Sequence, residues 1–392
     1  MRMIGLLTNV ALAALMVQGS AGAQAPAAAT SEPAAVPEVE ESDIATLPTM
    51  SDHLAFVMSA WGNGTRLING DTGKMLATIH TIPLSNVAID PRRRFVYVAE
   101  TIWTKGNRGT RQDMVSVYDA RTLKLLHEIP LPGRLLTGNR VQNLAISADG
   151  NLAYIYDMTP AAALHVVDLA RRRLVSSVEI PGCALAFAGA GGAVASLCGD
   201  GTLATIRLDG RRKAVVTSSE PFFDADNDPI FDNSVVDRST GKAFFLSYSG
   251  LIYETMIGPG GGAMQKPWSI QEAGGMARGS TVPLTSGWLP GGRQLLSYHS
   301  ATGRLFVLMH LGEFWSHKAD GTELWVLDAG TRKLIARRAL KDPITYMQVT
   351  QDDKPLLFLA GKGKMIVLDA TTYEEKHGLE EIGAGMISVS GR

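Results

Sequence analysis

The stretch Leu324-Trp325-Val326-Leu327-Asp328 is an apolar run that ends in an aspartate, and it decides the fold because the pattern recurs along the chain. The other copies lie at Arg66–Asp71, Val115–Asp119, His165–Asp168, Leu203–Asp209 and Met365–Asp369. A short turn follows each copy, and the carboxylate accepts hydrogen bonds from the backbone N–H groups of that turn. The β-branched and aromatic residues on either side favour strands of about five residues.

A second pattern precedes each of these strands: a turn with Asp or Gly leads into another apolar run, as Ile89-Asp90-Pro91 does before Phe95–Val98. Two hairpins per copy give a four-stranded antiparallel sheet, which buries its faces only when copies pack radially. About seven copies are present. They begin near His53, Ala88, Leu144, Ala184, Val235, Ser297 and Met347.

These copies predict an all-β fold, a seven-bladed β-propeller over residues 49–392. The alternative is a β-sandwich or two stacked β domains, and the sustained period argues against it. Two stretches break the period, the acidic Pro221–Phe231 and the Gly-rich Gly258–Gly292. Long loops inside a repeat array carry interactions. Trp268 and Trp288 indicate that the second stretch packs against something and is not a disordered excursion.

The start of the chain has the pattern of a secretory signal. Arg2 is followed by the largely apolar Ile4–Val17 and then by Ala21-Gly22-Ala23, a small-residue cleavage pattern. We therefore predict a signal peptide at residues 1–23, cut after Ala23 or Ala25. The alternative is an uncleaved anchor, but the apolar run is too short to span a bilayer comfortably.

Residues 24–48 are rich in Ala, Pro and Glu, which predicts a flexible leader. The whole chain is 45% hydrophobic and 19% charged, a composition typical of a globular protein. The formal net charge of −1 excludes the strong basic field of a nucleic-acid binder. A signal peptide on such a chain predicts a periplasmic protein.

Cys183 and Cys198 are the only cysteines in the 392 residues. Export to an oxidising compartment favours a disulfide between them, and the alternative is two buried free thiols. The bridge would close a loop of ~15 residues, which stabilises a fold by about 3 kcal/mol in the loop-entropy model. The chain has no Cys-x-x-Cys-His motif, so no c-type haem is attached to it.

No convincing catalytic set is present, because the chain lacks a Gly-x-Ser-x-Gly elbow, a His-Glu-x-x-His motif and a Walker loop. His299, His310 and His317 fall within one predicted blade, but their spacing fits no metal template, so we expect structural or surface roles. The cationic loop Gly106–Gly109 has the composition of an anion-binding loop, and a solvated hairpin tip is the favoured interpretation. We predict no catalytic, cofactor-binding or metal-ligating residue on this chain.

The sequence resembles the heavy subunits of the quinoprotein amine dehydrogenases, the methylamine and aralkylamine dehydrogenase family. The resemblance extends from about Phe56 to Ile382 and is clearest outside the repeat. The segments that carry it are Arg111–Asp119, Cys198–Gly201, Asp228–Phe231, Trp288–Gly292, His317–Lys318, Leu324–Asp328 and Gln351–Leu357. The Asp228–Phe231 segment with Ser247–Gly250 is more similar to the aralkylamine branch, and Gln351–Leu357 to the methylamine branch.

The resemblance implies a heterotetramer of two heavy and two small light subunits. The light subunit would carry tryptophan tryptophylquinone, which converts a primary amine to an aldehyde and ammonia, and electrons would pass to a blue copper protein. The heavy subunit would hold the light one and shape the substrate entrance. An intra-blade disulfide of the family matches Cys183 and Cys198, in agreement with the argument from export.

One departure concerns the substrate entrance. The family tends to place an aromatic residue in the turn before the second blade, and here that turn reads Thr81-Ile82-Pro83-Leu84-Ser85. The resemblance makes Ile82, Pro83 and Leu84 the candidate channel rim. Plain core or rim packing is the alternative role of Ile82 and Leu84.

Two other functions compete with the amine dehydrogenase reading. One is a free-standing periplasmic propeller that binds a ligand or an envelope protein. The other is a self-sufficient propeller enzyme such as a lactonase. A lactonase would require a ring of acidic or His ligands on the central channel, and no such set recurs at matching blade positions.

Overall fold

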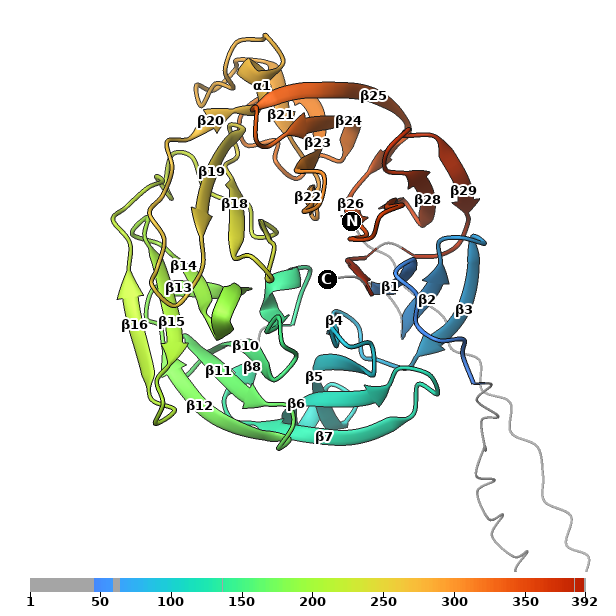
Figure 1. Ribbon diagram of the computed structural model, residues 1–392, viewed down its shortest axis with the longest axis vertical. Coiled ribbons are helices and arrows are strands. Elements are labelled where there is room, and N and C mark those ends of the chain that lie inside the picture. The colour runs from blue at the N-terminus through green and yellow to red at the C-terminus, as the bar shows by residue number, and fades with distance from the viewer. Residues whose placement is uncertain (1–45, 59–63, 136, 384, 391–392) are drawn as a thin grey trace, which may run out of the picture. The chain divides into compact units, whose positions relative to one another are not determined.

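The computed structural model describes residues 46–58, 64–135, 137–383 and 385–390. The predicted signal peptide, residues 1–23, and residues 24–45 of the predicted leader lie outside the described residues. Seven antiparallel sheets form a ring, as Figure 1 shows, and they confirm the predicted seven-bladed β-propeller. The described residues contain no helix that is long and apolar enough to cross a bilayer.

The first three blades run clockwise from the right in Figure 1. From the centre outward, the first has strands β30 (Ile387–Val389), β1 (Leu54–Met58), β2 (Thr65–Asn69) and β3 (Lys74–Ile79). The second has β4 (Asn86–Ile89), β5 (Phe95–Lys105), β6 (Arg108–Asp119) and β7 (Leu125–Leu131). The third has β9 (Leu144–Ile146), β10 (Leu152–Thr159), β11 (Ala163–Asp168) and β12 (Arg173–Glu179), with β8 (Arg134–Leu135) added to β10.

The remaining four blades complete the circle. The fourth has β13 (Cys183–Ala188), β14 (Val194–Cys198), β15 (Leu203–Leu208) and β16 (Ala214–Ser218), and the fifth has β17 (Val235–Val236), β18 (Lys242–Leu246), β19 (Leu251–Met256) and β20 (Trp268–Ser269). The sixth has β22 (Leu296–His299), β23 (Arg304–Gly312), β24 (Gly321–Asp328) and β25 (Lys333–Ile344), with β21 (Gly287–Pro290) added to β23. The seventh has β26 (Tyr346–Val349), β27 (Leu356–Gly361), β28 (Lys364–Asp369) and β29 (Glu375–Leu379).

Three short helical turns accompany the strands: η1 (Val141–Asn143), η2 (Ala190–Gly192) and α1 (Ile270–Ala273). The connection that contains η1 crosses toward the fifth blade, because the N–H of Val141 donates to Asn233 Oδ1 (2.7 Å). Figure 1 shows this green segment inside the ring. The centre of the ring is therefore partly filled by the chain itself.

The blades have two distinct ends. Because neighbouring strands are antiparallel, the turns after the first and third strands of each blade share one end, which we call the turn face. The turns after the second strand and the connections between blades share the other end, which we call the hairpin face. The tip of the β5–β6 hairpin, at Gly106 and Asn107, lies on the hairpin face.

Strands near the centre are buried on both sides, because each blade packs between two others. All six residues of β27 are buried, and its Phe358 shares a core cluster with Phe56 of the first blade. Such strands read as continuous apolar runs rather than alternating ones. The core is therefore formed by contacts between neighbouring blades and not within any single blade.

The aspartate turns are built as the sequence predicts. Asp119 Oδ1 accepts the N–H groups of Arg121 (2.9 Å) and Thr122 (2.8 Å), and Asp369 Oδ1 does the same for Thr371 and Thr372. In the first blade Asn69 takes this role, since its Oδ1 accepts the N–H of Asp71 (2.8 Å). The carboxylate of Asp71 is left to bind elsewhere.

The first blade closes the ring with a strand from the other end of the chain. Strand β30 pairs with β1 in the register Ala55↔Val389, Phe56↔Ser388 and Val57↔Ile387. The copy predicted to begin near His53 therefore supplies only the three outer strands of its blade. The Ser390 hydroxyl donates to the carbonyl of Ser51, and Arg93 forms an ion pair with Asp52, which ties the second blade to the closure.

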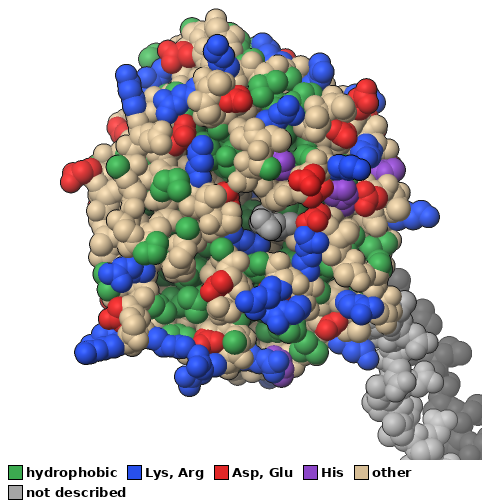
Figure 2. Space-filling view, in the orientation of Figure 1, with side chains coloured by type: hydrophobic (Ala, Val, Ile, Leu, Met, Phe, Trp, Pro, Cys, Tyr) green, Lys and Arg blue, Asp and Glu red, His purple; other side chains and the backbone are tan. Residues whose placement is uncertain are grey.

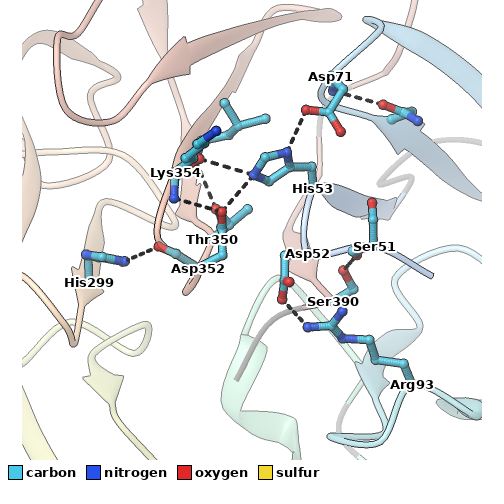
Figure 3. A network of polar contacts seen from close by, with 12 residues as sticks. Ser51, Asp52, His53, Asp71, Arg93, His299, Thr350, Asp352, Lys354 and Ser390 are labelled. Carbon is cyan, nitrogen blue, oxygen red and sulfur yellow. Dashed lines mark hydrogen bonds and ion pairs between the residues drawn. The ribbon is translucent and has the colours of Figure 1, made fainter. Parts of the chain in front are cut away.

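A histidine connects the first and last blades on the turn face. Figure 3 shows His53 between Asp71 and Asp352, with Nδ1 2.6 Å from Asp71 Oδ1 and Nε2 2.9 Å from Asp352 Oδ2. Burial alone would lower the pKa of His53, but the two carboxylates outweigh it and hold the pKa above its ordinary value. Asp352 also links the sixth blade, because its carbonyl lies 3.0 Å from His299 Nε2.

The disulfide predicted between Cys183 and Cys198 is present, and it joins residues directly opposite each other on β13 and β14. The bridge lies at the hairpin-face end of the fourth blade, between its two innermost strands. It closes a sequence separation of 15 residues, which matches the loop length expected from the sequence.

Replacing His53 with Ala should lower the free energy of unfolding, and the loss should depend on pH. A raised folded-state pKa means that the protonated imidazole stabilises the native state fully below the unfolded pKa of about 6.5, and that this contribution fades as pH rises through the folded pKa. Urea unfolding of wild type and His53→Ala should thus differ more at about pH 6 than at about pH 9. A difference that does not change over this range would contradict the charged bridge, and His377→Ala is the neighbouring histidine control.

Candidate functional site

The candidate site is a depression on the hairpin face beside the β5–β6 hairpin, with a volume of about 390 Å³. Its wall combines Ile82 and Pro83 from the turn before β4 with Trp103 from β5 and Met158 from β10. Arg111 on β6 and both residues of β8, Arg134 and Leu135, also line it, and the remaining lining residues are Thr101, Gly106, Asn107 and Thr137. The surface thus combines apolar and aromatic side chains with polar ones and two guanidinium groups, those of Arg111 and Arg134. A few polar groups among apolar ones are typical of sites for small molecules.

The hairpin that shapes this depression is unusually long for the ring. Strands β5 and β6 have 11 and 12 residues, and their register pairs Trp103 with Arg111 and Lys105 with Arg108. Beyond the buried half of the hairpin, residues 104–110 are exposed. The cationic loop Gly106–Gly109 is therefore the tip of a hairpin at the surface, as the favoured interpretation of the sequence has it.

Arg111 is held in place by a buried carboxylate. Its Nε lies 2.5 Å from Asp113 Oδ2, and its Nη2 lies 2.6 Å from Asp113 Oδ1. Asp113 Oδ1 also accepts the hydroxyl of Thr101 (2.6 Å) and the N–H of Leu135 (3.2 Å). Burial favours the neutral acid, but the bonds from Arg111 and Thr101 outweigh it and hold the pKa of Asp113 below its ordinary value.

The ion pair between Arg111 and Asp113 orients two side chains of the wall, Arg111 and Trp103. A bidentate guanidinium–carboxylate contact fixes the plane of the guanidinium. The Arg111 group then lies over the Trp103 ring, with 5.8 Å between its Cζ and the ring centroid. Asp113 also neutralises the positive charge of Arg111, so this arginine repels a cationic amine less than an unpaired arginine would. Arg134, which also lines the depression, forms no ion pair with the described residues.

The rim residues predicted from the resemblance lie in one turn but not all in the wall. Ile82 and Pro83 line the depression, whereas Leu84 is half-buried and lies outside its lining. The turn is held by the Ser85 hydroxyl, which donates to the carbonyl of Ile82 (2.8 Å). Leu84 has a φ of 64°, a left-handed conformation that costs roughly 1–2 kcal/mol for a residue with a Cβ.

A buried acid lies near this turn. Glu100 on β5 is buried, and its Oε1 accepts the hydroxyl of Ser116 (2.5 Å). Burial raises the pKa of Glu100, and the hydrogen bonds from Ser116 and from the backbone of Ile82 offset only part of that effect. Glu100 does not line the depression, so its contact with the Ile82 backbone supports the rim turn.

A second group of aromatic residues lies on the hairpin face over the fifth and sixth blades. The His317 ring stacks on Tyr248, with centroids 4.0 Å apart and an interplanar angle of 18°, and Phe231 and Trp315 meet these rings edge-on or tilted. Trp315 and the nearby Leu311 remain 53% and 64% exposed. This surface offers apolar contact area for a protein partner.

The three histidines of the sixth blade do not converge. His299 lies at a turn on the turn face, with Nδ1 2.8 Å from the Thr302 hydroxyl, whereas His310 bonds Ser316 through Nε2 (2.7 Å) and His317 stacks on Tyr248. In the described part of the chain, no group of three His, Cys, Asp or Glu residues is placed to hold a metal ion. The contacts of these three histidines are therefore packing and turn contacts.

The long stretch Gly258–Gly292 is ordered against its own ring. Trp268 is buried, and its Nε1 donates to Glu254 Oε1 (2.7 Å). Trp288 lies 5.8 Å from Trp325 between ring centroids, and Arg337 lies over both rings at 4.8 and 4.7 Å. The inference that these two tryptophans pack against something is confirmed, and what they contact is this chain.

Sequence reasoning missed the most prominent members of the wall, Trp103, Arg111 and Met158. The length of the segment 95–119 is a usable signal, because it is much longer than two strands of five residues joined by a short turn. In a hairpin with a tip at Gly106 and Asn107, Trp103 and Arg111 become neighbours by register alone.

The fold and the site together define a β-propeller that presents an aromatic-walled depression on one face. A family model for the methylamine dehydrogenase heavy chain (MADH) matches residues 53–390, which is the whole ring. The chain belongs to this family.

Relatives and solved structures agree with this assignment at different levels. The methylamine dehydrogenase heavy chain of Methylophilus methylotrophus is 26% identical over 390 residues, covering 97% of this chain and 93% of the relative. The heavy chain of Paracoccus versutus is 28% identical over 325 residues, covering 81% and 74%. A dihydro-heme d1 dehydrogenase aligns at a TM-score of 0.54 and 15% identity over 88% of this chain and 78% of its own, which shows the fold alone.

Replacing Asp113 with Ala should lower the free energy of unfolding by about 3 kcal/mol, because it leaves the Arg111 guanidinium and the Thr101 hydroxyl without their buried partner. Chemical denaturation measures this loss. The matched control is Asp353→Ala, which removes an exposed carboxylate on the turn face and should stay within about 0.5 kcal/mol of wild type. Equal effects of the two substitutions would show that the Arg111–Asp113 pair does not organise the wall.

Proposed function

We propose that the chain is the heavy subunit of a periplasmic amine dehydrogenase, exported by the signal peptide at residues 1–23 and freed of it by cleavage. It would hold a small light subunit in a tetramer of two heavy and two light chains. The observation that carries the proposal is the family match over residues 53–390, which spans every blade. Membership in a heavy-chain family implies a light-chain partner.

The redox chemistry of the proposed complex belongs to the partner. Tryptophan tryptophylquinone on the light subunit would supply oxidation of a primary amine to aldehyde and ammonia, and a blue copper protein would accept the electrons. The described residues of this chain hold no metal-binding cluster of their own. The apolar part of the wall, which includes Ile82, Pro83 and Met158, suits a site beside chemistry supplied by another chain.

This chain's own part would be to line the amine entrance. Ile82, Pro83 and Met158 offer apolar contact, and the Trp103 ring offers a face that attracts an ammonium group. Arg111, already paired with Asp113, would order the Trp103 ring without adding an uncompensated positive charge. The exposed Leu311 and Trp315 on the same face would contribute contact area to the light subunit.

A complex with a quinone-bearing partner can be tested directly. A tagged chain recovered from its native cells should bring down a smaller chain, show a visible quinone absorbance that a primary amine bleaches, and reduce a redox dye only when amine is added. A panel of amines then names the substrate. A colourless chain that co-purifies with nothing and reduces no dye would refute the heavy-subunit role and favour a free-standing propeller that binds a ligand or an envelope protein.

Replacing Trp103 with Ala in the intact complex should raise KM for the amine by about tenfold with little change in kcat, because the ring contributes about 1.4 kcal/mol of contact to the bound cation. Steady-state dye reduction measures both constants. Tyr373→Ala removes a half-buried aromatic residue from the turn face and should leave both unchanged. Wild-type kinetics for Trp103→Ala would exclude Trp103 from the entrance.

A further inference from the structure

Basic residues concentrate on one half of the turn face. Five of the six turns of the second, third and fourth blades on this face carry charged residues, namely residues 90–94, 119–124, 147–151, 168–173 and 209–213, and the sixth, residues 189–193, has none. The five charged turns contain 11 Lys or Arg residues and 5 Asp residues. We call these five turns the basic arc. The chain as a whole has 37 basic and 38 acidic residues, so the arc is a local excess within a balanced protein.

The other half of the same face has no such excess. The matching turns of the fifth, sixth and seventh blades are residues 237–242, 257–267, 299–304, 328–333, 350–354 and 369–375, with 7 basic and 7 acidic residues. On the face shown in Figure 2, Lys and Arg side chains gather over the lower half of the ring, where β4 to β12 lie, and acidic and basic side chains alternate over the upper half. The two halves therefore differ in charge although they share one fold.

The carboxylates of the basic arc are used mainly inside their own turns, and one of them, Asp168, also accepts a hydrogen bond from Arg212 of another turn through Oδ2 (3.1 Å). Asp119 and Asp209 accept backbone N–H groups of the residues that follow them. Asp149 bonds Ser147 and Asn151, and Asp168 bonds the N–H of Arg171. Burial would raise the pKa values of Asp149 and Asp168, but these bonds, together with the guanidinium groups of Arg171 and Arg212 beside Asp168, outweigh it. The pKa values of Asp119, Asp149 and Asp168 therefore lie below their ordinary value, and all three stay ionised.

Most of the basic side chains of the arc form no ion pair with the described residues of this chain. Four of the 11 form ion pairs, namely Arg93, Arg94, Arg171 and Arg212. Among the described residues, no carboxylate forms an ion pair with the other seven. These are Arg92, Arg121, Lys124, Arg172, Arg173, Arg211 and Lys213, and all seven are exposed.

The basic arc also lacks an apolar anchor. Within its five turns Leu169 is buried and Leu123 is half-buried, and no aromatic residue is present. Stable protein interfaces concentrate their binding energy in buried aromatic and aliphatic anchors. A surface of guanidinium and ammonium groups without such an anchor is better matched to a layer of mobile phosphate groups, which can rearrange to pair with the basic side chains.

We propose that the basic arc binds the surface of an anionic phospholipid bilayer. Guanidinium groups pair with phosphate oxygens through two parallel hydrogen bonds, and each basic residue near an anionic surface strengthens adsorption by a similar increment. The arc spans three adjacent blades at one end of the ring, so several arginines reach a flat surface together. Adsorption through the arc turns the hairpin face, with the depression beside Trp103, away from the lipid.

Sedimentation of the full chain, with any subunit that co-purifies, tests this proposal on vesicles. At low ionic strength the protein should sediment with vesicles of phosphatidylglycerol and phosphatidylcholine and not with pure phosphatidylcholine. The triple variant Arg121→Gln, Arg172→Gln, Arg211→Gln should lower the partition coefficient by about 100-fold. Salt at about 0.5 M should release the wild-type protein, because screening shortens the reach of each charge.

The matched control is Lys333→Gln, Lys354→Gln, Lys376→Gln, which removes three exposed charges from the other half of the ring and should stay within about threefold of wild type. Thermal unfolding of both variants establishes that they are folded, and the salt response of the wild type is independent of either. Absence of wild-type binding to anionic vesicles, or an equal loss in the two variants, would overturn the proposal. Binding to polyglutamate without binding to vesicles would overturn it too, and would assign the arc to an acidic polypeptide.

Discussion

The pairing of β30 with β1 is the contact on which the rest of the ring depends. It joins residues more than 300 positions apart, in the register Phe56↔Ser388. A radial array with an open end would expose one strand edge and the apolar faces of its first and last blades. Closure places Phe56, Phe358 and Ile387 in one core cluster. The apolar surfaces of the first and last blades are therefore buried against each other only after the two ends of the chain meet.

The repeated aspartate turn gives each blade a short and rigid end. Its last residue is in the left-handed region, where Gly73 is the natural choice and Leu123, Arg172, Arg332 and Tyr373 adopt the same conformation at a cost of roughly 1–2 kcal/mol each. Hydrogen bonds to the aspartate carboxylate and carbonyl offset that cost. In the basic arc, where the carboxylates accept the N–H groups of their turns, most of the charges left at the surface are those of arginines and lysines.

Local pattern was sufficient to predict the blades because strand, turn and disulfide are set by residues close in sequence. The predicted starts Ala88, Leu144, Ala184, Val235, Ser297 and Met347 all fall within the innermost strand of a blade. The start near His53 marks a second strand instead, because its inner neighbour comes from the C-terminal end of the chain. The extra strands β8 and β21, the role of Asn69 in place of Asp71, and the His53–Asp352 contact across 299 positions likewise depend on three-dimensional contacts that no local pattern reports.

The site was less predictable than the fold for a related reason. Repetition explains most of the chain, and a dihydro-heme d1 dehydrogenase aligns with it at 15% identity and shares only the fold, so the shape of the ring does not by itself indicate a reaction. What distinguishes this chain lies in its departures from the repeat: the long β5–β6 hairpin, the connection that holds Val141 against Asn233, and the tryptophans of Gly258–Gly292. The first of these brings Trp103 and Arg111 to Ile82 and Pro83. The turn before β4 has no aromatic residue, and Trp103 of the neighbouring hairpin supplies one to the same wall. The composition of the wall therefore depends on the register of β5 and β6 as well as on the turn.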